Sequence, residues 1–272
     1  MTETDAPTDE ILFAVEDGVA TVTLNRPERR NAFHDDMVRA WVARLEAWRQ
    51  DDAVRVIVFT GAGEGEGSAF SSGGDTGRFA DKAAQTPLEA KAAMTANTQS
   101  LARAVAAIDK PVIAALNGMA VGGGLDLALM CDVRLAAASM RVAETYAKVG
   151  LVPGVGGAWF LPRIVGRAAA LDMFWTCRWV GSEEALSMGL VNHVFPDDTF
   201  RDEVRAYARR IAEAAPLSVR FIKRLVDQGM EADLHSHLDT LSSHIALIRT
   251  SDDHKEALAA LRDKRKPVFT GR

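Results

Sequence analysis

Three consecutive glycines, Gly122–Gly124, follow an apolar run and precede Asp126 by one intervening residue. The run Val112–Leu116 predicts a buried strand, and the glycines are expected to open a helix. Because glycine has no Cβ atom, a ligand can approach its main chain closely. The first N–H groups of a helix lack intrahelical acceptors, so they can stabilise an anion or an oxygen that becomes negative during a reaction. A tight strand-to-helix turn without a chemical role would use the same glycines.

A second glycine-rich segment, Ser68–Asp75, follows the apolar run Val54–Thr60 and its glycine-rich exit, Gly61–Gly67. Each of the two strand exits can supply one inward-pointing N–H group. Two backbone donors that converge on one oxygen form an oxyanion hole. The sequence therefore favours a reaction in which negative charge develops on a substrate oxygen.

The segments that must hold these exits alternate between strand and helix patterns. Asp17-Gly18 is a hairpin signal between two predicted strands, and after about residue 195 only helical patterns remain. Alternating strands and helices predict repeated β-α units and a sheet covered by helices. The predicted strands are Ile11–Glu16 and Val19–Asn25, the predicted helices are Asp35–Gln50 and Thr86–Ile108, and a late apolar stripe comprises Leu234, Leu238, Leu241, Ile245 and Ile248. We interpret that stripe as core or subunit interface.

Composition narrows the class of protein. The chain has 272 residues, 48% of them hydrophobic, and a formal net charge of −5. No Lys/Arg run predicts nucleic-acid binding, and no apolar stretch is long enough to cross a membrane. Two cysteines are too few for a disulfide framework, and no Cys/His spacing predicts a metal site. We expect a cytoplasmic protein whose acidic residues 1–10 form a disordered lead-in.

Several motifs, in order along the chain, resemble the crotonase superfamily, which is the enoyl-CoA hydratase/isomerase family. The resemblance covers the chain from about residue 10 to the C-terminus. It implies a spiral of repeated ββα units over residues 11–195 and a helical C-terminal region over 196–272 that assembles a homotrimer, or a hexamer of two trimers. The matching segments are Leu24–Ala32, Ala69–Asp75, Lys110–Gly118, Gly122–Asp126, Gly150–Gly157, Ala185–Val191 and Lys264–Phe269.

The resemblance also implies an acyl-coenzyme A thioester as substrate, with no other cofactor. By position, the oxyanion donors are the N–H groups of Gly74 and Gly123. Arginine suits phosphate groups, although Arg29 and Arg30 would equally serve as surface charge. The positions assigned to substrate or coenzyme A contacts are Arg29, Arg30, Ser72, Gly73, Asp75, Gly122, Lys264 and Phe269, the last two from a tail that in relatives sometimes belongs to a neighbouring subunit.

Hydratases of this family hold their water between two carboxylates, and only the first position is acidic here. That residue is Asp126, which is one methylene shorter than the usual glutamate. The second position holds Tyr146, a poor base at neutral pH that can still donate a hydrogen bond. The isomerase position after Pro153 is Gly154. If residues 142–148 form a strand, Glu144 shares a face with Tyr146 and becomes a further candidate.

We therefore expect enoyl-CoA hydratase/isomerase-type chemistry in fatty-acid or related acyl-CoA metabolism. One base can move a proton between two carbons, so Asp126 alone suits an isomerase, whereas a hydratase needs Tyr146 or Glu144 as an unconventional partner. Thioester hydrolysis or C–C cleavage would reuse the oxyanion hole with another base. A CoA-binding homologue that lost its acid–base pair is the non-catalytic alternative.

Overall fold

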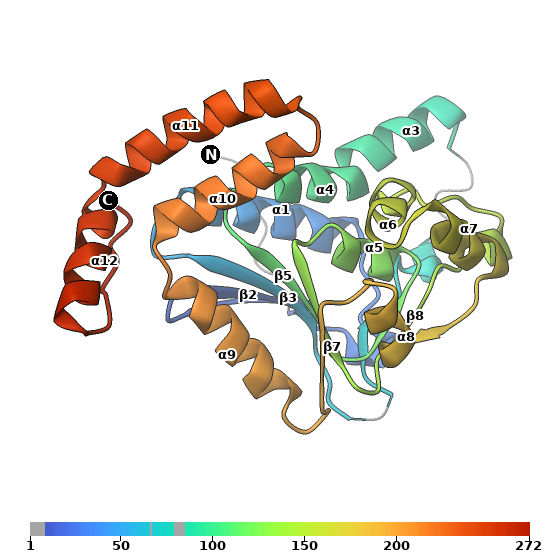
Figure 1. The fold of residues 1–272 in the computed structure, drawn as a ribbon. Coiled ribbons are helices and arrows are strands. Elements are labelled where there is room, and N and C mark those ends of the chain that lie inside the picture. The colour runs from blue at the N-terminus through green and yellow to red at the C-terminus, as the bar shows by residue number, and fades with distance from the viewer. Residues whose placement is uncertain (1–8, 66, 79–84) are drawn as a thin grey trace, which may run out of the picture.

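The computed structural model describes residues 9–65, 67–78 and 85–272, and Figure 1 shows the arrangement of its elements. Residues 1–8 of the expected disordered lead-in lie outside the described residues. Asp9 and Glu10 form a turn, and the Asp9 carbonyl accepts a hydrogen bond from the Asn25 side chain at 2.7 Å.

The larger of two sheets has six strands in the order β1-β2-β3-β5-β7-β10. β1 and β2 form the predicted antiparallel hairpin, and the other neighbours are parallel. The strands are β1 (Ile11–Glu16), β2 (Val19–Leu24), β3 (Val56–Gly61), β5 (Val112–Leu116), β7 (Val133–Ala137) and β10 (His193–Phe195).

In the central repeats, successive strands along the chain alternate between the larger and the smaller sheet. β3, β5 and β7 in the large sheet are followed along the chain by β4, β6 and β8, which pair in parallel in the small one. This alternation is the expected spiral of ββα units. The strands of the small sheet are β4 (Ala69–Ser71), β6 (Met119–Val121), β8 (Arg141–Ala143) and β9 (Val180–Gly181).

Helices enclose both sheets and then continue without further strands to the C-terminus (Figure 1). Those of the repeats are α1 (Asp35–Gln50), α3 (Pro87–Ala96), α4 (Thr98–Ala106), α5 (Gly123–Leu129), α6 (Gly157–Val165), α7 (Arg167–Thr176) and α8 (Ser182–Ser187). The late helices are α9 (Phe200–Ala212), α10 (Pro216–Gly229), α11 (Leu234–Thr250) and α12 (Asp252–Asp263). Short 3₁₀ turns are η1 (Pro27–Arg29), η2 (Thr76–Arg78) and η3 (Tyr146–Val149).

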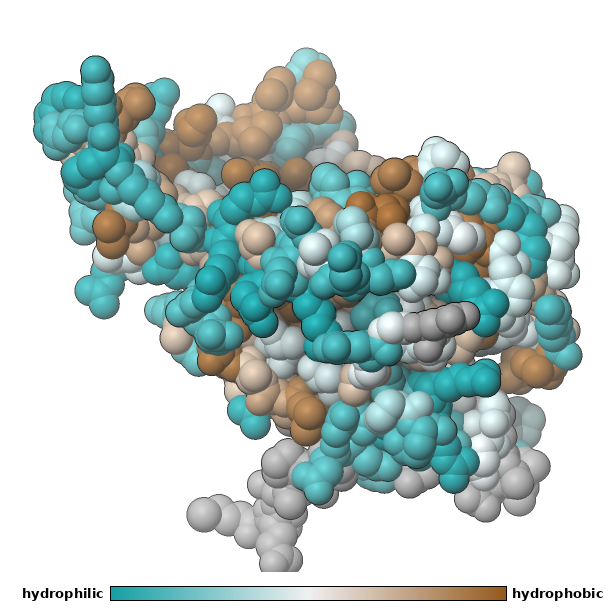
Figure 2. Space-filling model, turned by 90° about the horizontal axis from the view of Figure 1, so that it is seen from below, coloured by the Kyte–Doolittle hydropathy of each residue, from teal (hydrophilic) through white to brown (hydrophobic). Residues whose placement is uncertain are grey.

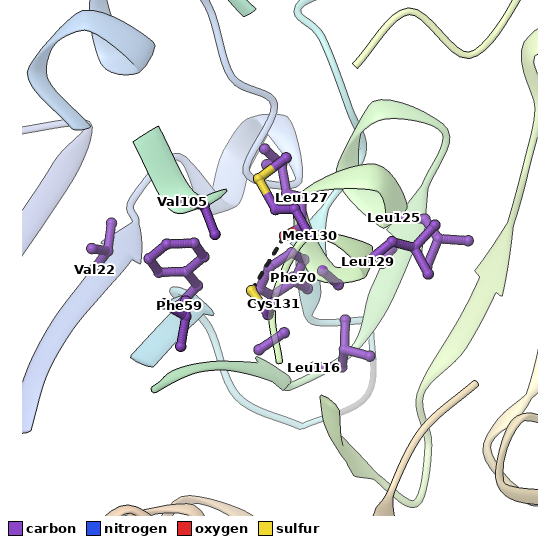
Figure 3. Packing of buried hydrophobic residues seen from close by; sticks show 14 of the residues in the cluster. Val22, Phe59, Phe70, Val105, Leu116, Leu125, Leu127, Leu129, Met130 and Cys131 are labelled. Atoms are coloured by element: carbon purple, nitrogen blue, oxygen red, sulfur yellow. Dashed lines mark hydrogen bonds between the residues drawn. The ribbon is translucent and has the colours of Figure 1, made fainter. Parts of the chain in front are cut away.

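The central strands β3 and β5 of the large sheet are buried on both faces, as continuous apolar strands require. α9 covers one face, where Phe200 and Val204 pack in a cluster with Val58. On the other face Trp41 of α1 meets Phe59 edge to face, with ring centroids 4.6 Å apart. Figure 3 shows this second cluster continuing through Phe70 into the buried residues of α5. The core therefore fixes the positions of β4 and α5, which carry the two glycine-rich segments.

Two predicted elements differ from the structure. The single helix expected over Thr86–Ile108 is broken at Asn97, where φ is −101° and ψ is −94°, into α3 and α4. The strand considered over residues 142–148 ends at Ala143, and Tyr146–Val149 forms a 3₁₀ turn instead. Glu144 and Tyr146 therefore do not share the face of a strand.

The predicted stripe of the C-terminal region lies on α11 and is largely exposed. Leu234 and Leu238 are 67% and 49% exposed, whereas an apolar helix face is normally covered by other protein. Brown apolar side chains beside the C-terminal helices are visible in Figure 2. Six of the large apolar residues left exposed along α10, its C-terminal cap and α11 are Ile222, Val226, Met230, Leu234, Leu238 and Ile245. We call these six residues the α10–α11 apolar face.

Candidate active site

The two glycine-rich segments meet at the first turn of α5. Gly124 lies against the main chain of Ser71 so closely that any side chain at position 124 would clash with it. A Cβ atom built on Gly73 would lie 3.4 Å from the nitrogen of Gly123. Gly73 and Gly122 have φ angles of +94° and +49°, which favour glycine. The absence of side chains thus brings the end of β4 against the start of α5.

Two backbone N–H groups at this junction have no acceptor in the part of the chain that the structure describes. Phe33 donates to the Gly73 carbonyl at 2.9 Å and accepts from the Asp75 N–H at 2.8 Å. The N–H of Gly74, between them, points away from Phe33, because successive peptide groups of an extended chain alternate in direction. Gly123 is the first residue of α5, and its N–H has no intrahelical acceptor. Within the described residues, no hydrogen bond outside the regular elements engages either group.

A buried asparagine, which the sequence analysis did not single out, supports the first segment. Asn31 has a left-handed φ of +55° and is fully buried. Its side-chain amide donates to the carbonyls of Ala62 and Ala69 at 2.9 and 2.6 Å. The only sequence signal for this role was that residue 31 is an asparagine, because asparagine is among the few residues other than glycine that tolerate a left-handed backbone conformation.

Asp75 is held by contacts within the chain. One carboxylate oxygen accepts from the Arg26 guanidinium at 2.9 Å, and the other accepts from the Gly77 N–H at 3.1 Å. The hydrogen bond from Arg26 lowers the pKa of Asp75 below its usual value. Arg26 also pairs with Glu10 at 3.0 Å. These contacts order the loop beside Gly74 and engage both oxygens of Asp75.

Asp126, Tyr146 and Glu144 come together although they lie on different elements. The hydroxyl of Tyr146 donates to Asp126 Oδ2 at 2.6 Å. Asp126 and Glu144 are each 0% exposed, whereas Tyr146 is partly exposed. Gly157, at the start of α6, packs against the Asp126 carboxylate so closely that a side chain there would clash. The shorter aspartate therefore lies behind the phenol, and Tyr146 is the accessible member of the group.

Burial dominates the protonation of this group. It raises the pKa of Asp126 to about 6, while the hydrogen bond from Tyr146 acts in the opposite direction. Burial, followed by the neighbouring Asp126 charge, raises the pKa of Glu144 to about 10. The same two causes raise the pKa of Tyr146 above its usual value, so it remains a neutral phenol. Burial therefore favours the un-ionised form of all three groups, and it does so more strongly at Glu144 than at Asp126.

The remaining predicted positions fall into two locations. Arg29 and Arg30 are exposed beside the first glycine-rich segment, and their carbonyls accept from the side chain and N–H of Ser72 at 3.3 and 2.9 Å. The Phe269 carbonyl instead accepts from Arg55 at 2.8 Å, at the opposite end of β3 from the glycine-rich exit. Lys264 directly follows α12, a helix that lies far from α5 in Figure 1. Within one chain, the tail and the glycine segments are therefore not brought together.

Gly154, the position where an isomerase acid was considered, packs near α3 and α4. Its carbonyl accepts from Gln99 at 3.2 Å, and a Cβ atom there would lie 3.3 Å from the Met94 terminal methyl.

Both cysteines are unpaired and buried. Burial raises the pKa of the Cys131 thiol, which donates a hydrogen bond to the Leu127 carbonyl at 3.4 Å (Figure 3). No group of three or more His, Cys, Asp or Glu within the described residues could hold a metal ion. None of the described helices is long and apolar enough to cross a membrane.

Comparison with known proteins establishes the family. Residues 14–272 match the model of the enoyl-CoA hydratase/isomerase family. Curated relatives include 1,2-epoxyphenylacetyl-CoA isomerase of Escherichia coli, which is 35% identical over 263 residues, covering 96% of this chain and 98% of that protein. (E)-Benzylidenesuccinyl-CoA hydratase of Thauera aromatica is 37% identical over 267 residues, covering 96% of this chain and 99% of that protein. The chain belongs to the enoyl-CoA hydratase/isomerase family, and the resemblance inferred from its motifs is confirmed.

Solved structures of proteins described as enoyl-CoA hydratases or isomerases have the same fold as this chain. One, described as a putative enoyl-CoA hydratase/isomerase from Mycobacterium abscessus, superposes with a TM-score of 0.90 at 30% identity, covering 96% of this chain and all of that one. Another, a putative enoyl-CoA hydratase from Streptomyces coelicolor, has a TM-score of 0.89 at 33% identity, with 100% and 98% coverage. The predicted mixed α/β crotonase-type fold is thus confirmed. The family's named members are hydratases and isomerases, which confirms the expected class of enzyme.

Proposed function

We propose that this enzyme binds an acyl-CoA thioester and stabilises the enolate oxygen of that thioester with the N–H groups of Gly74 and Gly123. The observation that carries the proposal is the convergence of two glycine-rich segments, each with a backbone donor that lacks an acceptor. Such donors are most effective when they are fixed before the charge develops. The packing of Gly124 on Ser71 and the buried Asn31 provide that rigidity.

Asp126 and Tyr146 are proposed as the proton-transferring pair. The Tyr146 oxygen takes a proton from the carbon next to the thioester while the phenolic proton passes to Asp126 Oδ2. The electron pair of the broken C–H bond forms the enolate. Reversal of these transfers at a second carbon returns the proton and moves the double bond. Tyr146 is placed between substrate and carboxylate because it is partly exposed, whereas Asp126 is fully buried.

Isomerisation fits this pair better than hydration does. A single acid–base unit can move one proton between two carbons, whereas hydration through two carboxylates needs a second acid in contact with water. Glu144 is 0% exposed and cannot fill that role, and position 154 has no side chain. Hydration is the second candidate, because the relative from Thauera aromatica is a hydratase of 37% identity.

The α10–α11 apolar face favours assembly into a homotrimer, or a hexamer of two trimers. Exposed apolar faces of this kind usually mark contacts with another protein. In such an assembly the tail bearing Lys264 and Phe269 of one chain would reach the nucleotide bound beside Arg29 and Arg30 of another. The proposal requires no cofactor beyond the coenzyme A of the substrate, and a cytoplasmic location remains a prediction.

A panel of thioesters tests the function. We expect turnover of 3-enoyl-CoA into its conjugated 2-enoyl isomer, with slower hydration of 2-enoyl-CoA, both followed by ultraviolet absorbance and chromatography. 3-Hydroxyacyl-CoA and saturated acyl-CoA serve as probes for dehydration and thioester hydrolysis. Rapid hydrolysis of saturated acyl-CoA, or tight binding of every thioester without conversion of any, would contradict the proposal.

A further inference from the structure

Glu144 is a buried carboxyl group without an evident partner. It directly follows β8, is 0% exposed, and neither of its carboxyl oxygens has a hydrogen bond within the described residues. Oδ1 of Asp126 is likewise buried and without a hydrogen bond, while Oδ2 is engaged by Tyr146. Buried polar atoms are rarely left unpaired, because each loses its hydrogen bonds to water without gaining a new partner. Two neighbouring carboxyl groups therefore need a common explanation.

One proton held between the two carboxyl groups would explain how both can be buried. Two ionised carboxylates could not remain together in the interior, because neither would offset the lost hydration of the other. If Glu144 carries the proton, its O–H group becomes a donor and Asp126 Oδ1 becomes its acceptor. Asp126 would then accept one hydrogen bond at each oxygen, from Tyr146 on one side and Glu144 on the other.

We infer that Glu144 is a positioning residue, a permanently neutral carboxylic acid that donates to Asp126 Oδ1 and holds this carboxylate with Oδ2 toward Tyr146. The inference rests on the proposed function for its catalytic meaning. It also argues against the role of second acid considered for Glu144, since a fully buried neutral group reaches neither water nor substrate.

The surroundings of Glu144 favour the neutral state. The titratable groups that face it are Asp126 of α5, Tyr146 of η3 and the buried Cys177 that follows α7. None of them is a cation, and the Asp126 charge opposes a second negative charge. The pKa of Glu144, raised to about 10 by burial and by Asp126, agrees with this geometry.

Two substitutions separate a neutral acid from an ionised one. Glu144→Gln keeps a neutral donor of nearly the same size, so kcat/KM and its pH profile should remain within about twofold of the parent protein. Glu144→Leu removes the donor, which raises the pKa of Asp126, so activity should fall more at pH 6 than at pH 8. A loss in Glu144→Gln as large as that in Asp126→Asn would overturn the inference, because it would mean that an ionised Glu144 is required.

Infrared spectroscopy tests the proton directly and without substrate, so it decides the inference even if the proposed function fails. At pH 8 the parent protein should show the carbonyl stretch of one buried un-ionised carboxylic acid, and Glu144→Gln should lack it. Absence of that band from the parent protein would overturn the inference, whether or not Glu144→Leu folds.

Stability against pH gives a second independent readout. The unfolded chain releases the Glu144 proton near its ordinary pKa of 4.5, while the folded chain keeps it to about 10. The folded state therefore binds more protons between these values, and the parent protein loses stability as pH rises. Glu144→Gln lacks this loss, so its Tm relative to the parent should increase from pH 5 to pH 9. A constant difference in Tm would mean that Glu144 carries no proton.

Discussion

Around α5, polar side chains are buried and fixed by the chain itself, whereas along α10 and α11 apolar side chains are exposed. Asp126 is 0% exposed and accepts from Tyr146, and Asn31 satisfies carbonyls beside the first glycine-rich segment. Met230 and Leu234, by contrast, are 81% and 67% exposed. One chain thus contains a complete proposed proton-transfer group but leaves exposed a large apolar surface, which the proposed assembly would cover. Changes in the first region should act on chemistry, and changes in the second on assembly.

The largest effect is expected from Gly123→Val. A Cβ atom at this position would lie 3.2 Å from the ring of Phe33 and 3.5 Å from the Val155 side chain, so the branched residue must displace one of them. Valine keeps the N–H group, but its side chain should obstruct the approach of the thioester oxygen to the two oxyanion donors. We expect turnover to be abolished in steady-state assays.

Gly181→Val is the matched control for this substitution. Gly181 has a φ of −83°, and a Cβ atom added to it would have no neighbour within 4 Å, so valine should be accepted there. Circular dichroism must show that both variants are folded. Full activity in a folded Gly123→Val protein would remove Gly123 from the oxyanion hole.

Asp126→Asn and Tyr146→Phe should have the next largest effects. General acid–base catalysis contributes about 10²–10⁴-fold, so each variant should lose turnover in that range while its affinity for coenzyme A remains nearly unchanged. The two losses should not add, because both residues belong to one proton path. Steady-state kinetics and calorimetric titration with coenzyme A measure the two quantities.

The chain has a second tyrosine, Tyr207 on α9, which provides the control. Tyr207→Phe should leave turnover unchanged. Near-parental activity in Tyr146→Phe combined with a large loss in Asp126→Asn would show that Asp126 acts without the phenol, as the sequence alone suggested.

The smallest effect on chemistry is expected from Leu238→Glu on the α10–α11 apolar face. A charged side chain at an apolar contact between subunits should shift the mass in light scattering from a trimer or hexamer toward the 29.4 kDa monomer. Val15→Glu, on the edge strand β1, is the control, since Val15 is exposed to a similar extent. A parent protein that is monomeric at micromolar concentration would exclude the proposed assembly.

The sequence predicted the regular parts of the molecule well. The glycine triplet and the alternation of strands and helices led to the correct family and fold, because close backbone approach and apolar periodicity are local signals. The strand considered for residues 142–148 is not present beyond Ala143. Val142, Glu144, Tyr146 and Lys148 alternate as they would in a strand, but the backbone turns after β8 and forms a 3₁₀ turn.

The arrangement within the site could not be predicted, since it depends on packing between distant segments. The burial of Asp126 requires Gly157 at the start of α6, and Glu144 is influenced by Cys177, which lies beyond α7 in the chain. No local pattern specifies these contacts. The position of the C-terminal tail could not be predicted either, because its motif does not indicate that the Phe269 carbonyl accepts a hydrogen bond from Arg55 of the same chain.

The pH dependence of kcat/KM for the best enoyl-CoA substrate tests most directly whether Asp126 is the base, because this quantity reports ionisations of the free enzyme. The carboxylate must be ionised to accept a proton, and burial raises the pKa of Asp126 to about 6. We therefore predict that kcat/KM rises with pH through a midpoint near 6 and that this rise is absent from Asp126→Asn. A profile that is flat between pH 5 and 8, or a midpoint that persists in Asp126→Asn, would contradict the account.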